Sequence, residues 1–250
     1  GPDAWLGRPT AEAALRHVVD TMDGLRARRC RIEQLRAPDG SGDDPAAVTG
    51  NRARVVRELG LSGLVFLNQV HGRDVAVLRE PPRARPGTGD VAPDIADVDA
   101  VVTDVPLLGV AVLAADCVPV LLGDPVAGVV GAAHAGRVGA AAGVVDAVVT
   151  EMTALGAQPA RLEVLLGPSV CGRCYEVPPA MRAEVDAALP GSASTTRTGT
   201  AGLDLRAGLT RRLADLGVTK VATDPRCTVE DPDLFSHRRD GRCGRQAGIT

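Results

Sequence analysis

The sequence is poor in aromatic side chains, which make up 2% of its 250 residues. It therefore offers no row of rings on which the bases of a single-stranded nucleic acid would stack. Charge of one sign is also lacking, because 28 basic residues face 31 acidic ones and the formal net charge is -3. Without a basic surface the chain has no electrostatic footprint for nucleic acid or for an acidic membrane. We expect neither as a partner.

Long apolar runs are lacking too. No stretch of about 18 residues is free of charge, Gly and Pro, so a membrane-spanning helix is not expected. The opening residues, Gly1 to Trp5, do not have the basic and apolar regions of a secretory signal. The six cysteines are too few for a disulfide scaffold in a chain of this length. These features predict a reducing, cytoplasmic compartment, in which cysteines serve as buried fillers, ligands or nucleophiles.

The chain is rich in short apolar runs separated by turns, and each run predicts a strand. Near-continuous hydrophobicity predicts that most of these strands are buried on both faces. The runs cover residues 64–67, 75–78, 100–103, 109–114, 118–122, 128–133, 162–166 and 218–222. The first two flank residues 68–74 and look like two strands joined by a turn.

Helical spacing is clearest after the turn-rich segment 38–45. There Asp43 or Asp44 can cap a helix that has Pro45 in its first turn and ends at Gly60. Segment 191–202, rich in Ser, Thr and Gly, is expected to be a loop. Further helices are expected over residues 11–19, 140–154, 178–189 and 205–216. The pattern predicts a mixed α+β or α/β domain layered around sheet, without internal repeats or a linker between domains.

Three side chains with metal-binding chemistry occur at strand ends or turns. His71 follows Val70 in the first turn, Cys117 interrupts two apolar runs, and His134 lies where a strand gives way to glycines. Two imidazoles and one thiolate suit zinc, and three protein ligands leave a fourth tetrahedral position for water or substrate. An alternative is a thiol hydrolase, in which Cys117 is the nucleophile and His71 or His134 the base.

Short segments around these residues are similar to the motifs of one bacterial family. They are Asn68-Gln69-Val70-His71-Gly72, Ala115-Asp116-Cys117-Val118-Pro119, Ala133-His134-Ala135-Gly136, Gly167-Pro168-Ser169, Cys174-Tyr175-Glu176-Val177 and Phe235-Ser236-His237-Arg238-Arg239-Asp240-Gly241. In this order the chain resembles the laccase-domain family, which is YfiH-like and is also called multicopper polyphenol oxidoreductase or purine nucleoside phosphorylase.

The resemblance implies an α+β fold of layered mixed β-sheets with flanking helices, a cysteine-hydrolase-like fold related to a toxin. It also implies a single catalytic domain over residues 1–250, with a divergent part at residues 1–42. The implied cofactor is zinc, with copper as the other possibility, held by the positions matching His71, Cys117 and His134.

The implied activity is phosphorolysis of adenosine, inosine and methylthioadenosine, with deamination of adenosine to inosine. The partners are then a purine nucleoside and phosphate, and the oligomeric state is left open. One alternative is the copper-dependent polyphenol oxidase of the family's older label, although the four histidines of the chain are few for a multicopper centre. The other is a relative that has lost catalysis and only binds zinc and a nucleotide.

Catalytic roles are expected for Cys117, Asp116 and Arg137. Asp116 can carry a proton beside the metal, or it can merely cap a strand end. Arg137, Arg239 and Arg245 are candidate phosphate ligands because guanidinium binds phosphate bidentately, and the glycine-flanked turn at Arg137 opens a helix whose N-terminus attracts anions. Arg239 can instead belong to a surface turn with an ion pair.

Two further residues are candidates for binding the base. Tyr175 can stack on a purine or pack in the core, and Gln69 can hydrogen-bond a base or its own turn. The Cys171-Gly172-Arg173-Cys174 motif is expected to be structural, because the prolines that soon follow do not suit the helix of a redox motif. A redox centre or a second metal site is the alternative.

Overall fold

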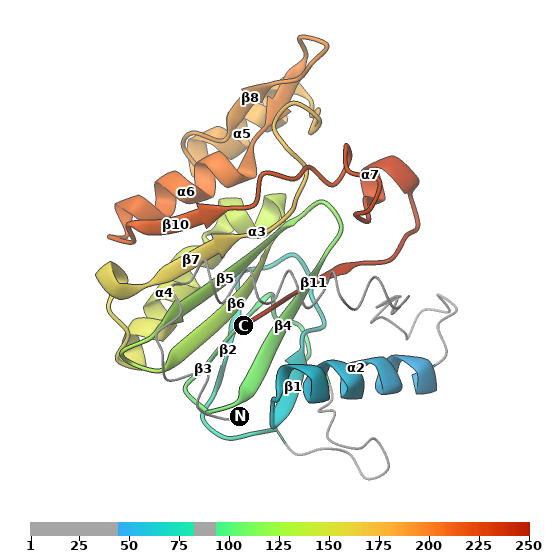
Figure 1. Ribbon diagram of the computed structural model, residues 1–250. Coiled ribbons are helices and arrows are strands. Elements are labelled where there is room, and N and C mark those ends of the chain that lie inside the picture. Colours follow the sequence, from blue (N-terminus) through green and yellow to red (C-terminus); the bar gives the residue numbers. More distant parts are fainter. Residues whose placement is uncertain (1–44, 83–93) are drawn as a thin grey trace.

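The computed structural model describes residues 45–82 and 94–250 (Figure 1). The helix predicted at residues 11–19 and the divergent part at 1–42 lie outside these residues. The described elements are α2 (Pro45–Leu59), β1 (Gly63–Phe66), β2 (Val75–Leu78), β3 (Ala100–Thr103), β4 (Leu108–Ala114), β5 (Val118–Asp124), β6 (Val129–Ala135), α3 (Arg137–Ala142), α4 (Val144–Ala154), the short 3-10 helix η2 (Pro159–Arg161), β7 (Glu163–Leu166), α5 (Pro179–Ala188), β8 (Ala193–Thr195), β9 (Ala201–Leu203), α6 (Leu205–Asp215), β10 (Lys220–Thr223), α7 (His237–Asp240) and β11 (Gln246–Ile249).

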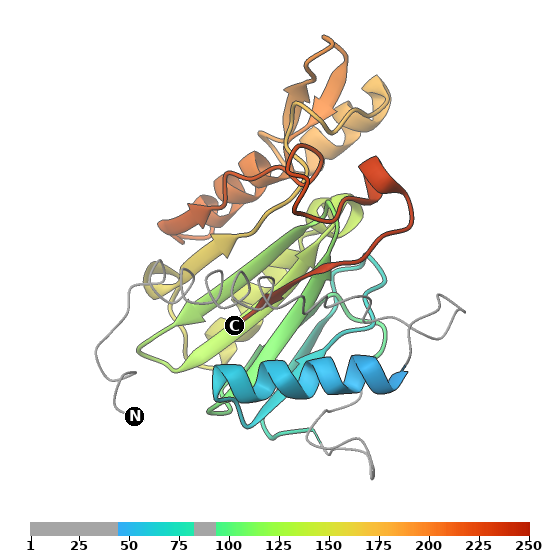
Figure 2. The same cartoon turned by 45° about the vertical axis from the view of Figure 1, so that its right-hand side comes forward.

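Two mixed sheets stack face to face between helices. The larger has six strands in the order β10-β7-β5-β6-β3-β2, and the smaller has the order β1-β4-β11. Helix α2 packs on the outer face of the smaller sheet, whereas α4 and α6 pack on the far face of the larger one (Figures 1 and 2). This arrangement confirms the α+β fold of layered mixed sheets with flanking helices.

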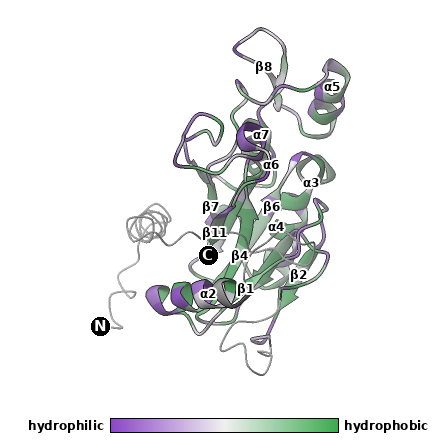
Figure 3. Cartoon of the chain, turned by 90° about the vertical axis from the view of Figure 1, so that its right-hand side faces the viewer, coloured by the Kyte–Doolittle hydropathy of each residue, from purple (hydrophilic) through white to green (hydrophobic). Residues whose placement is uncertain are grey.

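Alternating side chains of the central strands enter different cores. On β5, Val120 and Leu122 face the helices while Leu121 faces the smaller sheet. On β4, Val110 faces the larger sheet and Ala111 faces α2. Each such strand is therefore covered on both sides, which explains its near-continuous hydrophobicity. The predicted burial on both faces is confirmed for these strands, which are mainly green in Figure 3.

The first two strands do not form the expected pair. β1 lies parallel to β4 in the smaller sheet, and β2 lies parallel to β3 in the larger one. The segment 67–74 between them consequently crosses from one sheet to the other. This crossing matters for function because it carries His71 to the edge of the larger sheet.

Two other expectations fail for local reasons. The helix expected over residues 140–154 is divided at Gly143, whose φ of 88° is left-handed and ends α3 before α4 begins. The expected loop at 191–202 contains the hairpin of β8 and β9, whose strands of three residues are too short to show a pattern. Within residues 45–82 and 94–250, no helix has the length and apolarity needed to cross a membrane.

Candidate metal centre

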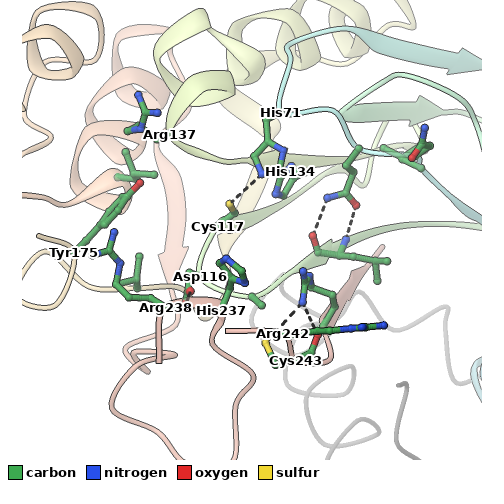
Figure 4. Close-up of a pocket in the computed structure, with 18 of the residues that line it drawn as sticks. His71, Asp116, Cys117, His134, Arg137, Tyr175, His237, Arg238, Arg242 and Cys243 are labelled. Atoms are coloured by element: carbon green, nitrogen blue, oxygen red, sulfur yellow. Dashed lines mark hydrogen bonds between the residues drawn. The ribbon is translucent and has the colours of Figure 1, made fainter. Parts of the chain in front are cut away.

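His71, Cys117 and His134 come from three different elements and meet at one point. His71 lies in the crossing segment, Cys117 in the turn between β4 and β5, and His134 near the end of β6. Because Pro119 of β5 is paired with His134 of β6, Cys117 lies beside the end of β6. The ligand atoms of the three residues all lie within 4.8 Å of one another. Cys117 Sγ is 4.0 Å from His71 Nε2 (Figure 4).

Asp99 holds two of these residues in place. Its side chain is fully buried just before β3, and its Oδ1 accepts a hydrogen bond from His134 Nδ1 at 2.8 Å. The carboxylate also accepts the backbone N–H groups of Val70, His71 and Gly72 at 3.0, 2.9 and 2.6 Å. With Nδ1 of His134 engaged, Nε2 is the nitrogen left to face the cluster. A carboxylate behind a histidine is the usual support of a metal-binding imidazole.

The charge of Asp99 is maintained by these donors. Burial by itself would raise its pKa, but hydrogen bonds from His134 and Gly72 outweigh burial, and the pKa lies below its ordinary value. The role of Asp99 was not predicted from the sequence. Its only signal is an acidic residue directly before a buried strand, and Asp97 two positions earlier looks much the same.

The protonation of the cluster favours a thiolate. Burial raises the pKa of Cys117, but hydrogen bonds from His134 and His71 outweigh it and lower the pKa to about 6. Burial lowers the pKa of His134, but its hydrogen bonds to Asp99 and Cys117 raise it to about 9. A deprotonated sulfur is the form that binds zinc, and a bound cation would displace the proton from His134. One thiolate and two imidazoles at this spacing therefore fit a zinc ion.

The glycines on either side of Arg137 are required by packing. A Cβ at Gly136 would lie 2.9 Å from His71 Cδ2 and 3.1 Å from Cys117 Sγ. A Cβ at Gly139 would lie 2.4 Å from the carbonyl oxygen of Gly72. His71 itself has a left-handed φ of 64°, which is uncommon for a residue other than glycine. The crossing turn and helix α3 thus fit together closely enough to fix the position of His71.

Replacing Gly139 by Ala is expected to push the backbone of the His71 turn outward. Because the opposing atom is a backbone oxygen, it cannot move aside cheaply, and overpacking of this kind costs about 1–3 kcal/mol. We expect the affinity for zinc to fall by about ten- to a hundredfold, as when the support of a ligand is disturbed. The measurement is a chelator competition for bound zinc.

The matched control is Gly50→Ala in the middle of α2, where an added Cβ meets no atom within 4 Å. This change is expected to leave zinc affinity unchanged and to stabilise the helix by about 0.5–1 kcal/mol. Unaltered zinc affinity in Gly139→Ala would show that the turn does not position His71.

The cluster opens onto a cleft of about 780 Å³, a volume that suits a small organic ligand. Besides the three candidate ligands, the cleft is lined by charged and aromatic side chains, among them Asp116, Arg137, Tyr175, His237, Arg238 and Arg242 (Figure 4).

Tyr175 lies between two arginines on one wall of the cleft (Figure 4). The Arg238 guanidinium carbon is 4.9 Å from the centre of the Tyr175 ring, while the positive charge of Arg137 acts to lower the pKa of the phenol. Burial, the largest influence, raises the pKa of Tyr175, so the phenol keeps its proton. Arg238 covers one ring face, and the ring also packs against the main hydrophobic core, which was the alternative predicted for Tyr175.

Asp116 is occupied by the C-terminal segment. Its Oδ1 accepts hydrogen bonds from the hydroxyls of Thr228 and Ser236 at 2.6 and 2.7 Å, and its Oδ2 accepts the Arg238 N–H at 2.7 Å. The residue has a φ of 96°, which is strained for a side-chain-bearing residue. This geometry favours a positioning role, in which Asp116 brings Arg238 to the cleft, over the expected proton transfer.

Two predicted binding residues are engaged elsewhere. The Gln69 amide donates to the Leu113 carbonyl oxygen and accepts the Leu113 N–H, both at 2.8 Å, so it anchors the crossing segment to β4. The Arg239 guanidinium donates to the carbonyl oxygens of Thr228, Asp231 and Leu234 and pairs with Asp240. Arg239 therefore takes the alternative role predicted for it, that of a residue in a turn that forms an ion pair.

Arg245 lines the cleft as predicted, although its Nη1 is hydrogen-bonded to the carbonyl oxygens of Cys243 and Gly244 at 2.6 and 2.9 Å. Three further lining residues, Arg238, Arg242 and His237, were not predicted from the sequence. Because α7 has only four residues, its sequence has no periodicity from which to predict whether Arg238 or Arg239 faces the cleft.

The chain is similar to known proteins over most of its length. The profile of the multi-copper polyphenol oxidoreductase laccase family matches residues 22–250. A protein of Streptomyces griseus named purine nucleoside phosphorylase is 56% identical over 84% of this chain and 83% of its own length. One of Streptomyces coelicolor with the same name is 52% identical over 97% of both chains.

Solved structures show the same fold. The crystal structure of YlmD from Geobacillus stearothermophilus has a TM-score of 0.74 at 32% identity and covers 85% of this chain and 82% of its own. That of a Bacillus licheniformis hypothetical protein, YfiH, has a TM-score of 0.74 at 28% identity, with coverage of 86% and 85%. The chain belongs to the multi-copper polyphenol oxidoreductase laccase family, the YfiH-like laccase-domain proteins.

Proposed function

We propose that the chain is a zinc-dependent purine nucleoside phosphorylase that acts on adenosine, inosine and methylthioadenosine and also deaminates adenosine to inosine. The observation that carries this proposal is the convergence of His71, Cys117 and His134 in the wall of an arginine-lined cleft. The names of the Streptomyces relatives support the phosphorylase activity.

His71, Cys117 and His134 would hold the ion, and Asp99 would keep two of them oriented. When bound, zinc would supply a Lewis acid and would lower the pKa of water to about 7, which is the requirement for hydrolytic attack on C6 of adenine. Residues of the cleft would bind and orient the nucleoside and the phosphate.

Arg137 and Arg238 are our candidates for the phosphate site. They flank Tyr175 on one wall of the cleft, and two guanidinium groups can grip a phosphate through several charge-assisted hydrogen bonds. In phosphorolysis a phosphate oxygen bonds to the anomeric carbon as the bond from that carbon to the base nitrogen breaks. Holding phosphate beside the sugar removes much of the entropic barrier to this step.

Arg137→Ala and Arg238→Ala are each expected to raise the apparent KM for phosphate by about ten- to a hundredfold. This corresponds to the loss of one hydrogen bond to a charged group, roughly 1.5–3 kcal/mol. Deamination uses no phosphate and should survive largely intact. The measurement is base release from inosine across a phosphate titration, together with ammonia release from adenosine.

Arg79→Ala is the control, because Arg79 is exposed, pairs with Asp104 and does not line the cleft. Equal loss of both activities in Arg137→Ala would assign that residue to the fold or the metal instead. If neither arginine affected KM, the phosphate would bind elsewhere, with Arg242 as the next candidate.

The donor set argues against the copper-dependent polyphenol oxidase. A multicopper centre needs more imidazoles than four, and His237, which also lines the cleft, has its Nδ1 hydrogen-bonded to the Gly241 carbonyl oxygen at 2.8 Å. Zinc at a site with one thiolate and two imidazoles has no redox chemistry, so oxygen uptake with a phenol substrate should stay at background.

A further inference from the structure

A second cluster of metal-binding side chains lies apart from the His71 site. The sulfur atoms of Cys171, Cys174 and Cys227 and a carboxylate oxygen of Glu230 all lie within 4.8 Å of one another. Glu230 Oε1 is 3.0 Å from Cys174 Sγ and 3.7 Å from Cys171 Sγ. The sequence connects Cys171 and Cys174 as a motif, but only the fold adds the other two residues.

The cluster is built from two turns of the same kind. In the first, Cys171 and Cys174 are separated by two residues, and the Cys174 N–H donates to the Cys171 carbonyl oxygen at 2.9 Å. In the second, Cys227 and Glu230 have the same separation, and the Glu230 N–H donates to the Cys227 carbonyl oxygen at 3.1 Å. Each turn thus presents two potential ligands side by side.

Backbone contacts hold the two turns against each other. The segments are joined by a parallel bridge between Ser169 and Cys227, and the Thr228 N–H donates to the Ser169 carbonyl oxygen at 3.2 Å. The Cys171 N–H donates to Cys227 Sγ at 3.3 Å. Cys227 is buried, so its sulfur faces the cluster rather than solvent.

We propose that Cys171, Cys174, Cys227 and Glu230 form a second, structural zinc site. Two ligand pairs, each spaced by two residues in a turn, match the ligand arrangement of structural zinc sites, and three thiolates with one carboxylate complete a tetrahedron. Thiolate-rich sets select zinc over harder cations. All four positions are filled by protein, so this site has no place for a substrate.

Arg197 is the competing partner of Glu230. The two form an ion pair in which the Arg197 side chain is 56% exposed. An exposed pair of this kind contributes little to stability, so it does not prevent the carboxylate from binding a cation. A disulfide between Cys171 and Cys174 would account for the closeness of these two sulfurs. It would not explain why Cys227 and Glu230 also approach them.

The site would brace one wall of the cleft. Cys174 directly precedes Tyr175, and Cys227 directly precedes Thr228, whose hydroxyl binds Asp116. A zinc ion joining the two turns would therefore fix the spacing between Tyr175 and the segment that positions Arg238. This role does not depend on which reaction the cleft catalyses.

The test is elemental analysis of the full chain purified under reducing conditions and loaded with zinc. We expect two equivalents in the parent, one in Cys174→Ser and one in Cys117→Ala. Cys243→Ser, the same change at a cysteine outside both clusters, should keep two. One equivalent in the parent that is lost in Cys117→Ala and retained in Cys174→Ser would overturn the proposal.

Cobalt spectroscopy of the parent covers the case in which a variant does not fold. Cobalt in the proposed site should give strong sulfur-to-metal charge-transfer absorption from three thiolates, in addition to the weaker absorption of one thiolate at the His71 site. Glu230→Gln should keep most of this absorption but lose the metal faster to a chelator. Absorption from a single thiolate, or two fewer alkylatable thiols because of a disulfide, would contradict the site.

Discussion

Replacing Cys117 by Ala is expected to abolish phosphorolysis and to remove the zinc of the cleft. Two imidazoles alone bind zinc far more weakly than the same pair with a thiolate. As a Lewis acid the ion would supply several kcal/mol of electrostatic stabilisation of the transition state, so its loss would correspond to a rate loss on the order of a thousandfold or more. The measurements are base release from inosine with saturating phosphate and zinc content per chain.

The reactivity of Cys117 distinguishes the proposed zinc enzyme from a thiol hydrolase. The low pKa of Cys117 would serve a nucleophile as well as a ligand. A coordinated thiolate is protected from alkylation, so iodoacetamide should modify Cys117 slowly in the zinc-loaded protein and quickly after chelation. Rapid modification with zinc still bound would indicate that Cys117 is a free nucleophile.

Replacing Asp99 by Ala is the second change with a large expected effect. It leaves the buried His134 Nδ1 and three part-buried backbone N–H groups without their acceptor. Removing one partner of a buried charged network destabilises by about 3–5 kcal/mol. Loss of the carboxylate behind a ligand also weakens metal binding by about ten- to a hundredfold. Thermal unfolding and a chelator competition measure the two effects.

Asp104→Ala is the matched control, because Asp104 follows the other end of β3 and only pairs with exposed Arg79. That change should alter the free energy of unfolding by less than about 1 kcal/mol. Asp99→Asn keeps the shape of the side chain but places an amide group where hydrogen-bond donors converge. We expect its effects on stability and on zinc affinity to be intermediate. Zinc affinity in Asp99→Ala equal to that of Asp104→Ala would contradict the supporting role of Asp99.

The strands could be predicted from the sequence because a strand that is buried on both faces is a nearly continuous run of apolar residues. Runs such as residues 100–103 contain little besides Ala and Val, and the structure places a strand there with the same bounds. Pairing was harder to predict, since nothing in residues 64–78 tells that β1 and β2 enter different sheets. The partners of these two strands, β4 and β3, are distant in the sequence, and the local pattern carries no information about them.

The candidate ligands were predictable because histidine is scarce here and each ligand interrupts an apolar run. The role of Asp99 in holding these ligands could not be predicted, because Asp99 acts through backbone N–H groups that any sequence would provide. Arg137 and Arg245 line the cleft as predicted, whereas the direction of the Arg239 side chain could not be predicted. Arg238 and Arg239 are adjacent and identical in type, but one faces the cleft and the other turns back onto backbone carbonyl oxygens.

The most direct test of the central claim is base release from inosine by the zinc-loaded chain, followed as phosphate is added. The claim is that His71, Cys117 and His134 hold the ion that makes this cleft a phosphorylase. We predict that free base and sugar 1-phosphate form in equal amounts, that release stops on chelation, and that zinc restores it. Zinc bound at this site without any phosphate-dependent release would contradict the claim and would leave a protein that binds the metal but does not catalyse this reaction.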